Sequence, residues 1–204
     1  DLPDTFEEFR STGLFKQTDE HEPAIAAPEK LATPSGKIEI YSETLAELAE
    51  TYDLAEDEHI NPIPMFEPGF QGYGKVTEEF PLYGAGFHHK SRTHSSFGFI
   101  EELEEVARQE VWINPVDAEE RGIKNGDRCS VKSPAGEIRI DAKVTPRIIP
   151  GVVGIPQGAW HKADMNGDRI DEGGCVNTLS TYHPTPLSKG NGNAHSMIVQ
   201  VAKA

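Results

Sequence analysis

The side chains best suited to chemistry lie in one fifteen-residue stretch, from Gly84 to Gly98. Its sequence is GAGFHHKSRTHSSFG, so histidines, two basic residues and small hydroxyl residues stand between glycines. Arg92 offers a planar fork of donors, Lys90 a point charge, and the hydroxyl groups short directional donors. This combination suits an anionic ligand rich in oxygen and nitrogen. An ordinary surface loop with locally satisfied histidines has the same composition, so the loop alone leaves both interpretations open.

The charge of the chain is divided unequally between two halves. Asp1 to Glu79 holds 19 acidic and 5 basic residues, a balance of −14, whereas Phe80 to Ala204 holds 15 and 14, a balance of −1. An acidic half repels nucleic acid and anionic membranes, so nucleic-acid binding is not expected. The nearly neutral half carries six of the eight histidines, and we expect the functional site there.

The cysteines and the apolar runs limit the classes of protein further. Cys129 and Cys175 are too few for a zinc ribbon or an iron–sulfur cluster. One disulfide and two free thiols are both compatible with the sequence, although a small buried thiol is the commoner state. No apolar run approaches the ~20 residues of a membrane helix, so direct membrane insertion is not expected. The chain does not begin with Met, and we expect a segment of a longer protein.

Short helices and strands alternate with turns along the chain. Asn114 is the predicted cap of a helix that Pro115 begins and Gly122 ends. In another short helix Leu103, Val106 and Ala107 are predicted to face inward. The predicted helices cover residues 4–10, 42–52, 100–108 and 115–121, and the predicted strands 37–41, 80–86, 110–113, 128–132, 137–144, 152–155 and 197–201. Many short strands with glycine and proline turns favour a closed β-barrel over a doubly wound sheet.

Residues 59–75 form a predicted linker, because proline and glycine preclude regular structure there. Its four large apolar residues are too many for a free tether, and we expect the linker to lie against a surface of the same or another domain. A disordered tether is the alternative. The four residues are Met65, Phe66, Phe70 and Tyr73.

The order of several motifs resembles the C-terminal molybdopterin-dinucleotide-binding domain of the dimethyl sulfoxide reductase family of molybdenum enzymes. The resemblance is closest to the catalytic subunits of the anaerobic dimethyl sulfoxide reductases. It implies a mainly β fold with short helices, a six-stranded double-psi β-barrel over residues 80–204, preceded by an acidic α/β lead-in and linker over residues 1–79. The motifs are WINPVDAEERGIKNGD, SPAGEI, VTPRIIPGVV, HHKSRTHS, GAWH, GGCVNTLS and PLSKGN.

The resemblance also implies a cofactor, bis(molybdopterin guanine dinucleotide) with molybdenum. The loop would contact the pterin and pyrophosphate region through backbone amides and polar side chains. Trp160 would offer an aromatic face, His161 a ring nitrogen, and Asn177 both donors and an acceptor. Lys189 and Asn191 would close over the same ligand. The loop residues implied are His88, His89, Lys90, Ser91, Arg92, Thr93, His94 and Ser95. Neither a catalytic residue nor a metal ligand is expected in the chain.

By the same resemblance the chain would belong to an enzyme that reduces an S-oxide or N-oxide, dimethyl sulfoxide among them, in anaerobic respiration. The metal ligand and a 4Fe-4S cluster would lie in an earlier part of that subunit, so we expect the chain alone to be inactive. The implied partners are the rest of the catalytic chain, an iron–sulfur subunit and a membrane-anchor subunit. The implied location is the extracytoplasmic face of the cell membrane, periplasmic in a Gram-negative organism.

Other interpretations of the same residues stay open at this point. A self-contained β-barrel binding module without redox chemistry would use similar loops. A hydrolase built on the histidines and serines of the loop is disfavoured, because no acidic partner stands at a telling spacing. Trp160 could also be a core residue and Asn177 a turn residue, and either role would remove it from the site.

Overall fold

The computed structural model describes residues 3–14, 31–56, 58–189 and 196–204. The chain divides into two compact units. One comprises Asp1–Glu50 with Asn61–Pro64, and the other comprises Thr51–Ile60 with Met65–Ala204. The predicted domain boundary between residues 79 and 80 falls inside the larger unit, just before its first strand, and stays a prediction.

The smaller unit contains helix α1 (Phe6–Thr12) and nearly all of α2 (Glu43–Thr51), both close to their predicted positions. The Thr5 hydroxyl accepts from the Glu8 amide and the Glu8 carboxylate accepts from the Thr5 amide, which forms a capping box. At α2 the Ser42 hydroxyl accepts from the Leu45 amide at 3.2 Å. Local capping chemistry therefore sets the start of both helices.

The predicted strand over residues 37–41 is wrong. These residues form bends and chain without regular secondary structure, and none of the described strands pairs with them. Ile38 is 85% exposed and Ile40 is 72% exposed. An alternating pattern produces a strand only where a neighbouring strand completes its hydrogen bonds, and here that partner is lacking among the described residues.

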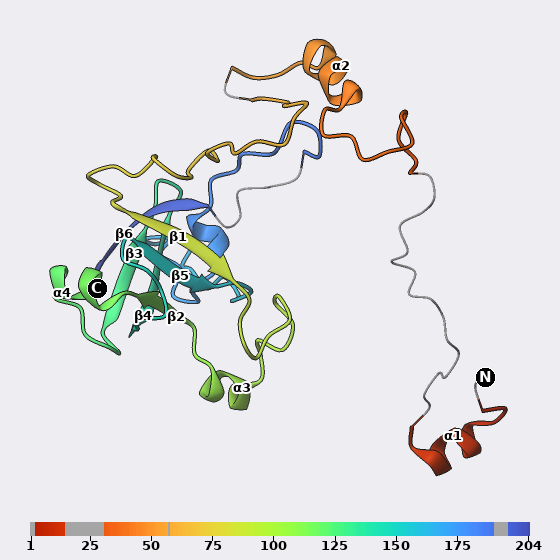
Figure 1. Ribbon diagram of the computed structural model, residues 1–204. Helices are drawn as coiled ribbons and strands as arrows, with labels where there is room; N and C mark the ends of the chain where they lie inside the picture. The colour runs from red at the N-terminus through yellow and green to blue at the C-terminus, as the bar shows by residue number, and fades with distance from the viewer. Residues whose placement is uncertain (1–2, 15–30, 57, 190–195) are drawn as a thin grey trace. The chain divides into compact units, whose positions relative to one another are not determined.

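The larger unit is built on a closed six-stranded β-barrel (Figure 1). The strand order around the barrel is β1-β5-β2-β4-β3-β6. The β1/β5 and β2/β4 pairs are parallel, and the other four pairs are antiparallel. The strands are β1 (Leu82–Phe87), β2 (Glu110–Ile113), β3 (Arg128–Lys132), β4 (Glu137–Val144), β5 (Val152–Pro156) and β6 (Met197–Lys203). The predicted mainly β fold with a closed barrel is confirmed.

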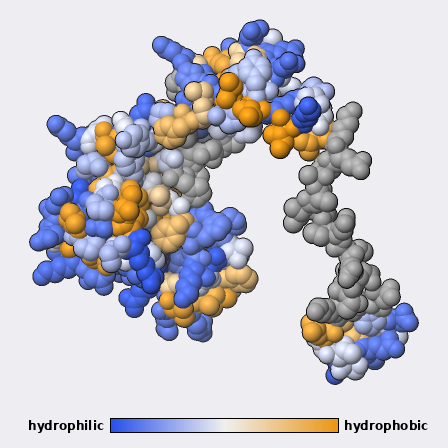
Figure 2. Space-filling model, in the orientation of Figure 1, coloured by the Kyte–Doolittle hydropathy of each residue, from blue (hydrophilic) through white to orange (hydrophobic). Residues whose placement is uncertain are grey.

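The barrel is closed around an apolar core. Along β4 the side chains of Ile138, Ile140 and Ala142 are buried, while the residues between them are partly exposed, as alternation requires. Burial of each aliphatic side chain of this size contributes roughly 1.5–3 kcal/mol. On the visible face of the barrel unit most surface is hydrophilic, with scattered apolar patches (Figure 2).

Three short helices lie in the connections between strands. Helix α4 (Pro115–Glu120) begins as predicted, because the Asn114 side chain accepts from the Val116 amide at 2.9 Å. Helix α3 (Glu101–Val106) lies in the connection that leaves the barrel between β1 and β2 (Figure 1), and we call residues 99–108 of this connection the α3 excursion. Val106 is 68% exposed, so its predicted inward orientation is wrong, since α3 projects from the barrel there. The third is a 3-10 helix, η1 (Val176–Leu179).

Residues 59–75 contain no helix or strand, as predicted, and residues 59–60 and 65–75 are part of the larger unit, within which they make contacts. The Gln71 amide donates to the Thr181 hydroxyl at 3.1 Å, and the ring centroids of Phe70 and His183 lie 4.2 Å apart. The expected contact with a surface is therefore present. It rests mainly on polar groups and one ring pair, because three of the four apolar residues are largely exposed: Met65, Phe66 and Tyr73.

Candidate functional site

A cavity of about 470 Å³ brings together three segments that are far apart in the sequence. The segments follow β1, follow β5, and lead into η1. Strands β1 and β5 are parallel neighbours with Phe87 opposite Pro156, so the two loops that follow them leave the barrel at the same end. We call this space the motif cavity. Its lining residues are His94, Ser95, Gln157, Gly158, Ala159, Trp160, His161, Cys175, Val176 and Asn177.

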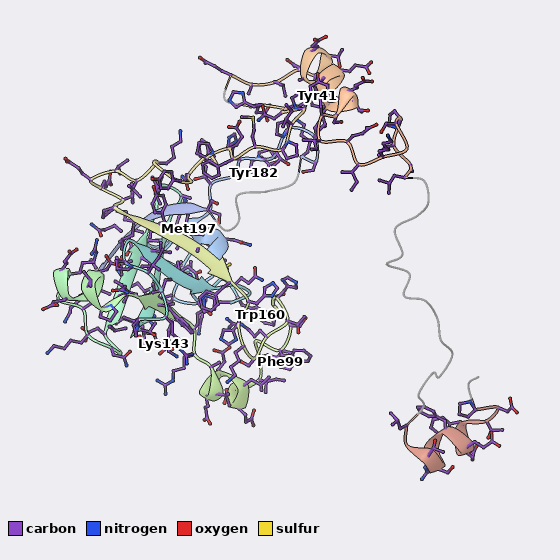
Figure 3. The ribbon with its side chains drawn as sticks, in the orientation of Figure 1. Tyr41, Phe99, Lys143, Trp160, Tyr182 and Met197 are labelled. Carbon is purple, nitrogen blue, oxygen red and sulfur yellow. The ribbon has the colours of Figure 1, made fainter. Side chains whose placement is uncertain are left out.

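Trp160 joins two walls of the motif cavity. Its indole Nε1 donates to the backbone oxygen of Ser95 at 2.9 Å, while 58% of the residue is exposed. Figure 3 labels Trp160 in the larger unit. The alternative role of Trp160 as a core residue is therefore wrong. A fixed indole with an accessible face is suited to stacking against a flat ligand.

Two glycines permit the close approach of these segments. A Cβ atom on Gly158 would lie 1.7 Å from the His94 carbonyl oxygen, and a Cβ atom on Gly173 would lie 2.1 Å from the Trp160 carbonyl oxygen. Gly158 also has φ +89°, in the region that favours glycine. Any side chain at either position would push the cavity walls apart.

Several lining side chains are left available for a ligand. Ser95, His161 and Asn177 are exposed, and within the described part of the chain their side chains have no hydrogen-bond partner. His94 is held at φ +51°, an uncommon conformation for a residue with a side chain. The cavity thus offers a hydroxyl, an imidazole and a carboxamide beside an aromatic face, a set suited to a flat ligand rich in heteroatoms.

Arg92 was expected to contact the ligand, but its side chain is used inside the protein. It is 8% exposed, and its Nη1 lies 2.9 Å from the Glu104 carboxylate while its Nη2 donates to Oε1 of the Gln109 side chain. Burial lowers the pKa of Arg92, and the Glu104 carboxylate opposes that effect. The guanidinium therefore holds the loop against the α3 excursion instead of lining the motif cavity.

Gln109 extends this hydrogen-bond network to the end of β5. It belongs to none of the sequence motifs and is not among the predicted site residues. Its Nε2 donates to the carbonyl oxygens of Pro156 at 2.8 Å and Gly174 at 2.9 Å. Gln109 thus links Arg92 to the end of β5 and to the segment before η1. No local pattern in the sequence marks this role, because its partners lie 17, 47 and 65 residues away.

His89 and Ser91 also turn inward. His89 is 6% exposed, and its Nδ1 accepts from the Ser91 amide at 3.2 Å, while the Ser91 hydroxyl donates to the Leu103 carbonyl at 3.1 Å. Burial, and next the charge of Arg92, lower the pKa of His89. Among the described residues His89 Nε2 has no hydrogen-bond partner of good geometry. These two residues shape the loop from within.

The first residues of the loop line a different space, a pocket of about 710 Å³ beside β2 and β4. Phe87 and Trp112 form part of its wall, with ring centroids 5.0 Å apart. Its charged and titratable lining residues are His88, His89, Lys90, Glu105, Arg108, Glu110, Lys143 and Arg147. The structure therefore separates His88, His89 and Lys90 from the motif cavity. Thr93 is exposed and lines neither of the two pockets.

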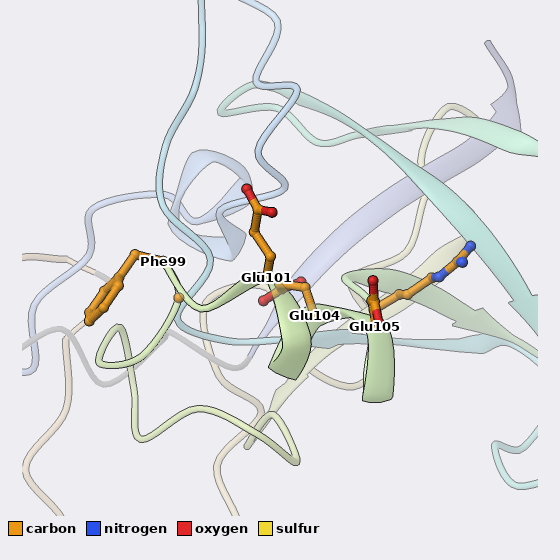
Figure 4. A pocket seen from close by; sticks show the side chains of 6 residues that line it. Phe99, Glu101, Glu104 and Glu105 are labelled. Carbon is orange, nitrogen blue, oxygen red and sulfur yellow. The ribbon is translucent and has the colours of Figure 1, made fainter.

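A further pocket, of about 460 Å³, lies on the α3 excursion (Figure 4). Glu101, Glu104 and Glu105 line it together with Phe99 and Arg108. Its acidic lining is unsuited to an anionic ligand.

The remaining predicted contacts lie near the end of the described chain. Lys189 has φ +52°, and its ammonium group lies 5.4 Å from the centre of the Tyr52 ring. It does not line the motif cavity. Asn191 lies outside the described residues. Both ligand contacts stay predictions.

The residues that the structure describes lack both a metal-binding cluster and a membrane-spanning helix. They contain no group of three or more His, Cys, Asp or Glu residues arranged to hold a metal ion. None of their helices combines the length and apolar character needed to cross a membrane.

A closed β-barrel whose loops surround a polar cavity is typical of ligand-binding barrel domains. The chain belongs to the family described as "Molydopterin dinucleotide binding domain", which matches residues 82–197. That span includes the barrel from β1 to the first residue of β6 and all residues that line the motif cavity. Membership of this family identifies the ligand of the domain as a molybdopterin cofactor.

The chain is similar to several reductases. It is 51% identical to the "Probable dimethyl sulfoxide reductase chain YnfF" and 48% identical to "Dimethyl sulfoxide reductase DmsA", both of Escherichia coli K12, over all of this chain and 26% of each relative. It is 34% identical to "Trimethylamine-N-oxide reductase 1" of the same strain, over 86% of this chain and 21% of that protein. The chain thus spans about a quarter of the length of its relatives, and the resemblance to dimethyl sulfoxide reductase chains is confirmed.

A solved structure shares the fold. "Acetylene Hydratase from Pelobacter acetylenicus" aligns with a TM-score of 0.67 and 19% sequence identity, over 86% of this chain and 24% of that one. At this identity the likeness establishes the fold alone.

Proposed function

We propose that the chain is the part of a molybdenum reductase that clamps bis(molybdopterin guanine dinucleotide) at the motif cavity. The observation that carries this proposal is the convergence of three separated motifs, GAWH, CVNT and the end of HHKSRTHS, on one cavity. Each motif contributes a side chain that has no hydrogen-bond partner among the described residues. A polar cavity with available donors and acceptors is the arrangement expected of a ligand site.

Four of the lining residues have distinct parts in holding the cofactor. Trp160 offers its face to the pterin rings, and its hydrogen bond to Ser95 fixes the orientation of that face. Asn177 supplies two donors and an acceptor for the edge of a pterin, and His161 supplies a ring nitrogen. The Ser95 hydroxyl and nearby backbone amides suit the anionic part of the ligand. When bound, the cofactor supplies the two-electron oxygen-atom chemistry, while the chain binds and orients it.

The substrate and the assembly are part of the same proposal. The names of the relatives support an S-oxide or N-oxide as the acceptor, with dimethyl sulfoxide first among them. We infer that a 4Fe-4S cluster, an iron–sulfur subunit and a membrane anchor complete the enzyme at the extracytoplasmic face of the membrane. The 204-residue chain alone is then inactive, because the chemistry depends on those parts.

The test is a titration of the 204-residue chain with metal-free molybdopterin guanine dinucleotide, followed by NMR. The proposal predicts that the largest changes in amide chemical shift fall on residues 94–95, 157–161 and 175–177, and that the indole Nε1–H signal of Trp160 moves. Changes confined to the pocket beside β2 and β4, or to the α3 excursion, would place the ligand elsewhere and refute it. Arg121, on the helix α4 side of the barrel, provides a reference that should not move.

A further inference from the structure

Asp171 is a fully buried carboxylate that lies behind two walls of the motif cavity. Its exposure is 0%, and none of the sequence motifs includes it. Its Oδ1 accepts from the amides of Lys162 at 2.7 Å and Gly173 at 2.9 Å. Its Oδ2 accepts from the Cys175 amide at 2.7 Å and the Thr178 hydroxyl at 3.1 Å. One side chain therefore holds both the segment after Trp160–His161 and the segment around Asn177.

The backbone of Asp171 is itself attached to the barrel. Its amide donates to the Glu137 carbonyl at 3.0 Å, and its carbonyl accepts from the Arg139 amide at 3.0 Å. Strand β4 thus fixes the position of Asp171, and the Asp171 carboxylate in turn fixes the two segments. This connection passes from a rigid strand to cavity walls that have no regular sheet structure of their own.

The four hydrogen bonds require a carboxylate. Every partner is a donor, so both oxygens must act as acceptors. An asparagine of the same shape keeps one acceptor, and its NH₂ group then faces at least one backbone amide that can only donate: Cys175 on one side, or Lys162 and Gly173 on the other. A buried donor that loses its acceptor is costly, and hydrogen bonds to a charged acceptor are about twice as strong as neutral ones.

From this geometry we infer that Asp171 is the positioning residue of the motif cavity, which sets the distance and orientation between His161 and Asn177 as they meet the ligand. The inference rests on the proposed function, since it assigns those two residues to cofactor binding. Asp171 is not among the residues that line the cavity. It acts by keeping donors and acceptors in place before the ligand arrives, which lowers the entropy lost on binding.

The variant Asp171→Asn tests this inference, with Asp117→Asn as its matched control. Asp117 is also buried, at 6% exposure, and its Oδ2 accepts from the Gly151 amide at 2.8 Å. It lies on α4, outside the residues that line the motif cavity. Both variants replace a buried carboxylate that accepts from backbone, but Asp117→Asn can keep its one hydrogen bond through the remaining oxygen, so Asp171→Asn should lower the melting temperature more. Only Asp171→Asn should loosen the cavity.

The readouts are the affinity for metal-free molybdopterin guanine dinucleotide and amide hydrogen exchange, both measured well below the melting temperature of each variant. For Asp171→Asn we expect binding at least about tenfold weaker than in the unaltered chain, and faster exchange at the Lys162 and Cys175 amides, with the β4 amides still protected. For Asp117→Asn we expect unchanged affinity. These results would support the inference.

If Asp171→Asn binds the dinucleotide as tightly as the unaltered chain does, or if Asp117→Asn weakens binding equally, the positioning role is refuted and Asp171 serves stability alone. Two other results would instead refute the proposed function. One is that the unaltered chain does not bind the dinucleotide, and the other is that substitutions of Asn177 leave its affinity for the dinucleotide unchanged. The two failures are therefore distinguishable.

Discussion

The indole nitrogen of Trp160 and the backbone oxygen of Ser95 lie 2.9 Å apart and join two loops that are separated by 65 residues in the sequence. Trp160 follows β5 and Ser95 follows β1, and these strands are parallel neighbours in the barrel. The hydrogen bond closes the space between the loops and leaves the indole face accessible. The shape of the motif cavity therefore depends on a contact between one side chain and one carbonyl.

Replacing Trp160 separates the two roles of the indole. Trp160→Phe keeps an aromatic face but loses the donor to Ser95, and we expect binding of the pterin dinucleotide to weaken by about 3–10-fold, the worth of one ordinary hydrogen bond. Trp160→Ala loses both roles and should bind more weakly still. Fluorescence of the bound pterin measures both affinities, and equal values for the two variants would contradict a stacking role.

A methyl group at Gly158 should force the two loops apart. Gly158→Ala meets the His94 carbonyl oxygen at 1.7 Å and also carries the cost of φ +89°. Gly126→Ala is the matched control, because Gly126 has φ +85° and no atom lies within 4 Å of its added Cβ. We expect Gly126→Ala to cost about 1 kcal/mol of unfolding free energy and Gly158→Ala about 1–3 kcal/mol more. Equal losses in chemical denaturation would show that the loops do not approach as described.

The two cysteines should differ in reactivity towards thiol reagents. Cys129 is fully buried in the barrel core, and burial raises the pKa of its thiol to about 11. Cys175 is partly exposed and lines the motif cavity. Because the thiolate is the reactive form, we expect Cys175 to be labelled at pH 8 and Cys129 to stay unlabelled until the protein unfolds. Mass spectrometry reads both sites.

The same experiment reports on the ligand. Prior addition of the pterin dinucleotide should slow labelling of Cys175 and leave Cys129 unaffected. Undiminished labelling at a saturating dinucleotide concentration would argue against occupation of the motif cavity.

His89 should make the stability of the fold sensitive to mildly acidic pH. Burial, and next Arg92, lower its pKa in the folded state below 6.5. Above about pH 7 the ring is neutral in both states, so the folded protein keeps its full stability. As the pH falls through about 6.5, the unfolded chain takes up the proton first, and the free energy of unfolding decreases until the pH also passes the folded pKa. Glu104 opposes this effect only partly.

The variant His89→Gln isolates this contribution, because glutamine is polar and does not titrate. Melting temperatures measured from pH 8 to pH 5 should fall more steeply for the unaltered chain than for the variant. Parallel curves would mean that His89 does not carry the pH dependence.

Local chemistry explains which parts of the fold were predictable. The start of α4 follows from Asn114 and Pro115 alone, and the β3–β4 hairpin follows from its alternation and its turn. The order of strands around the barrel depends on contacts between distant segments. The strand predicted at residues 37–41 fails for the same reason, since a strand depends on a partner.

In the candidate site, too, local motifs were predictable from the sequence, and contacts between distant residues were not. Sequence motifs identified Trp160, His161 and Asn177, which the structure brings together. They did not reveal that Arg92 would turn inward, because Glu104 and Gln109 become its partners only when the excursion folds back. Asp171 was missed because its role lies in four hydrogen bonds to backbone and hydroxyl donors. The glycine pair that follows it, Gly173 and Gly174, is the one local sign of a tight turn there.

The most direct test of the account is the dissociation constant of metal-free molybdopterin guanine dinucleotide for the unaltered chain and for Asn177→Ala. The Asn177 side chain is exposed and has no partner among the described residues, so its removal should leave the melting temperature unchanged. The account predicts saturable binding to the unaltered chain and binding to Asn177→Ala that is about tenfold weaker, the loss of one or two hydrogen bonds. Equal dissociation constants, or no saturable binding to the unaltered chain, would contradict it.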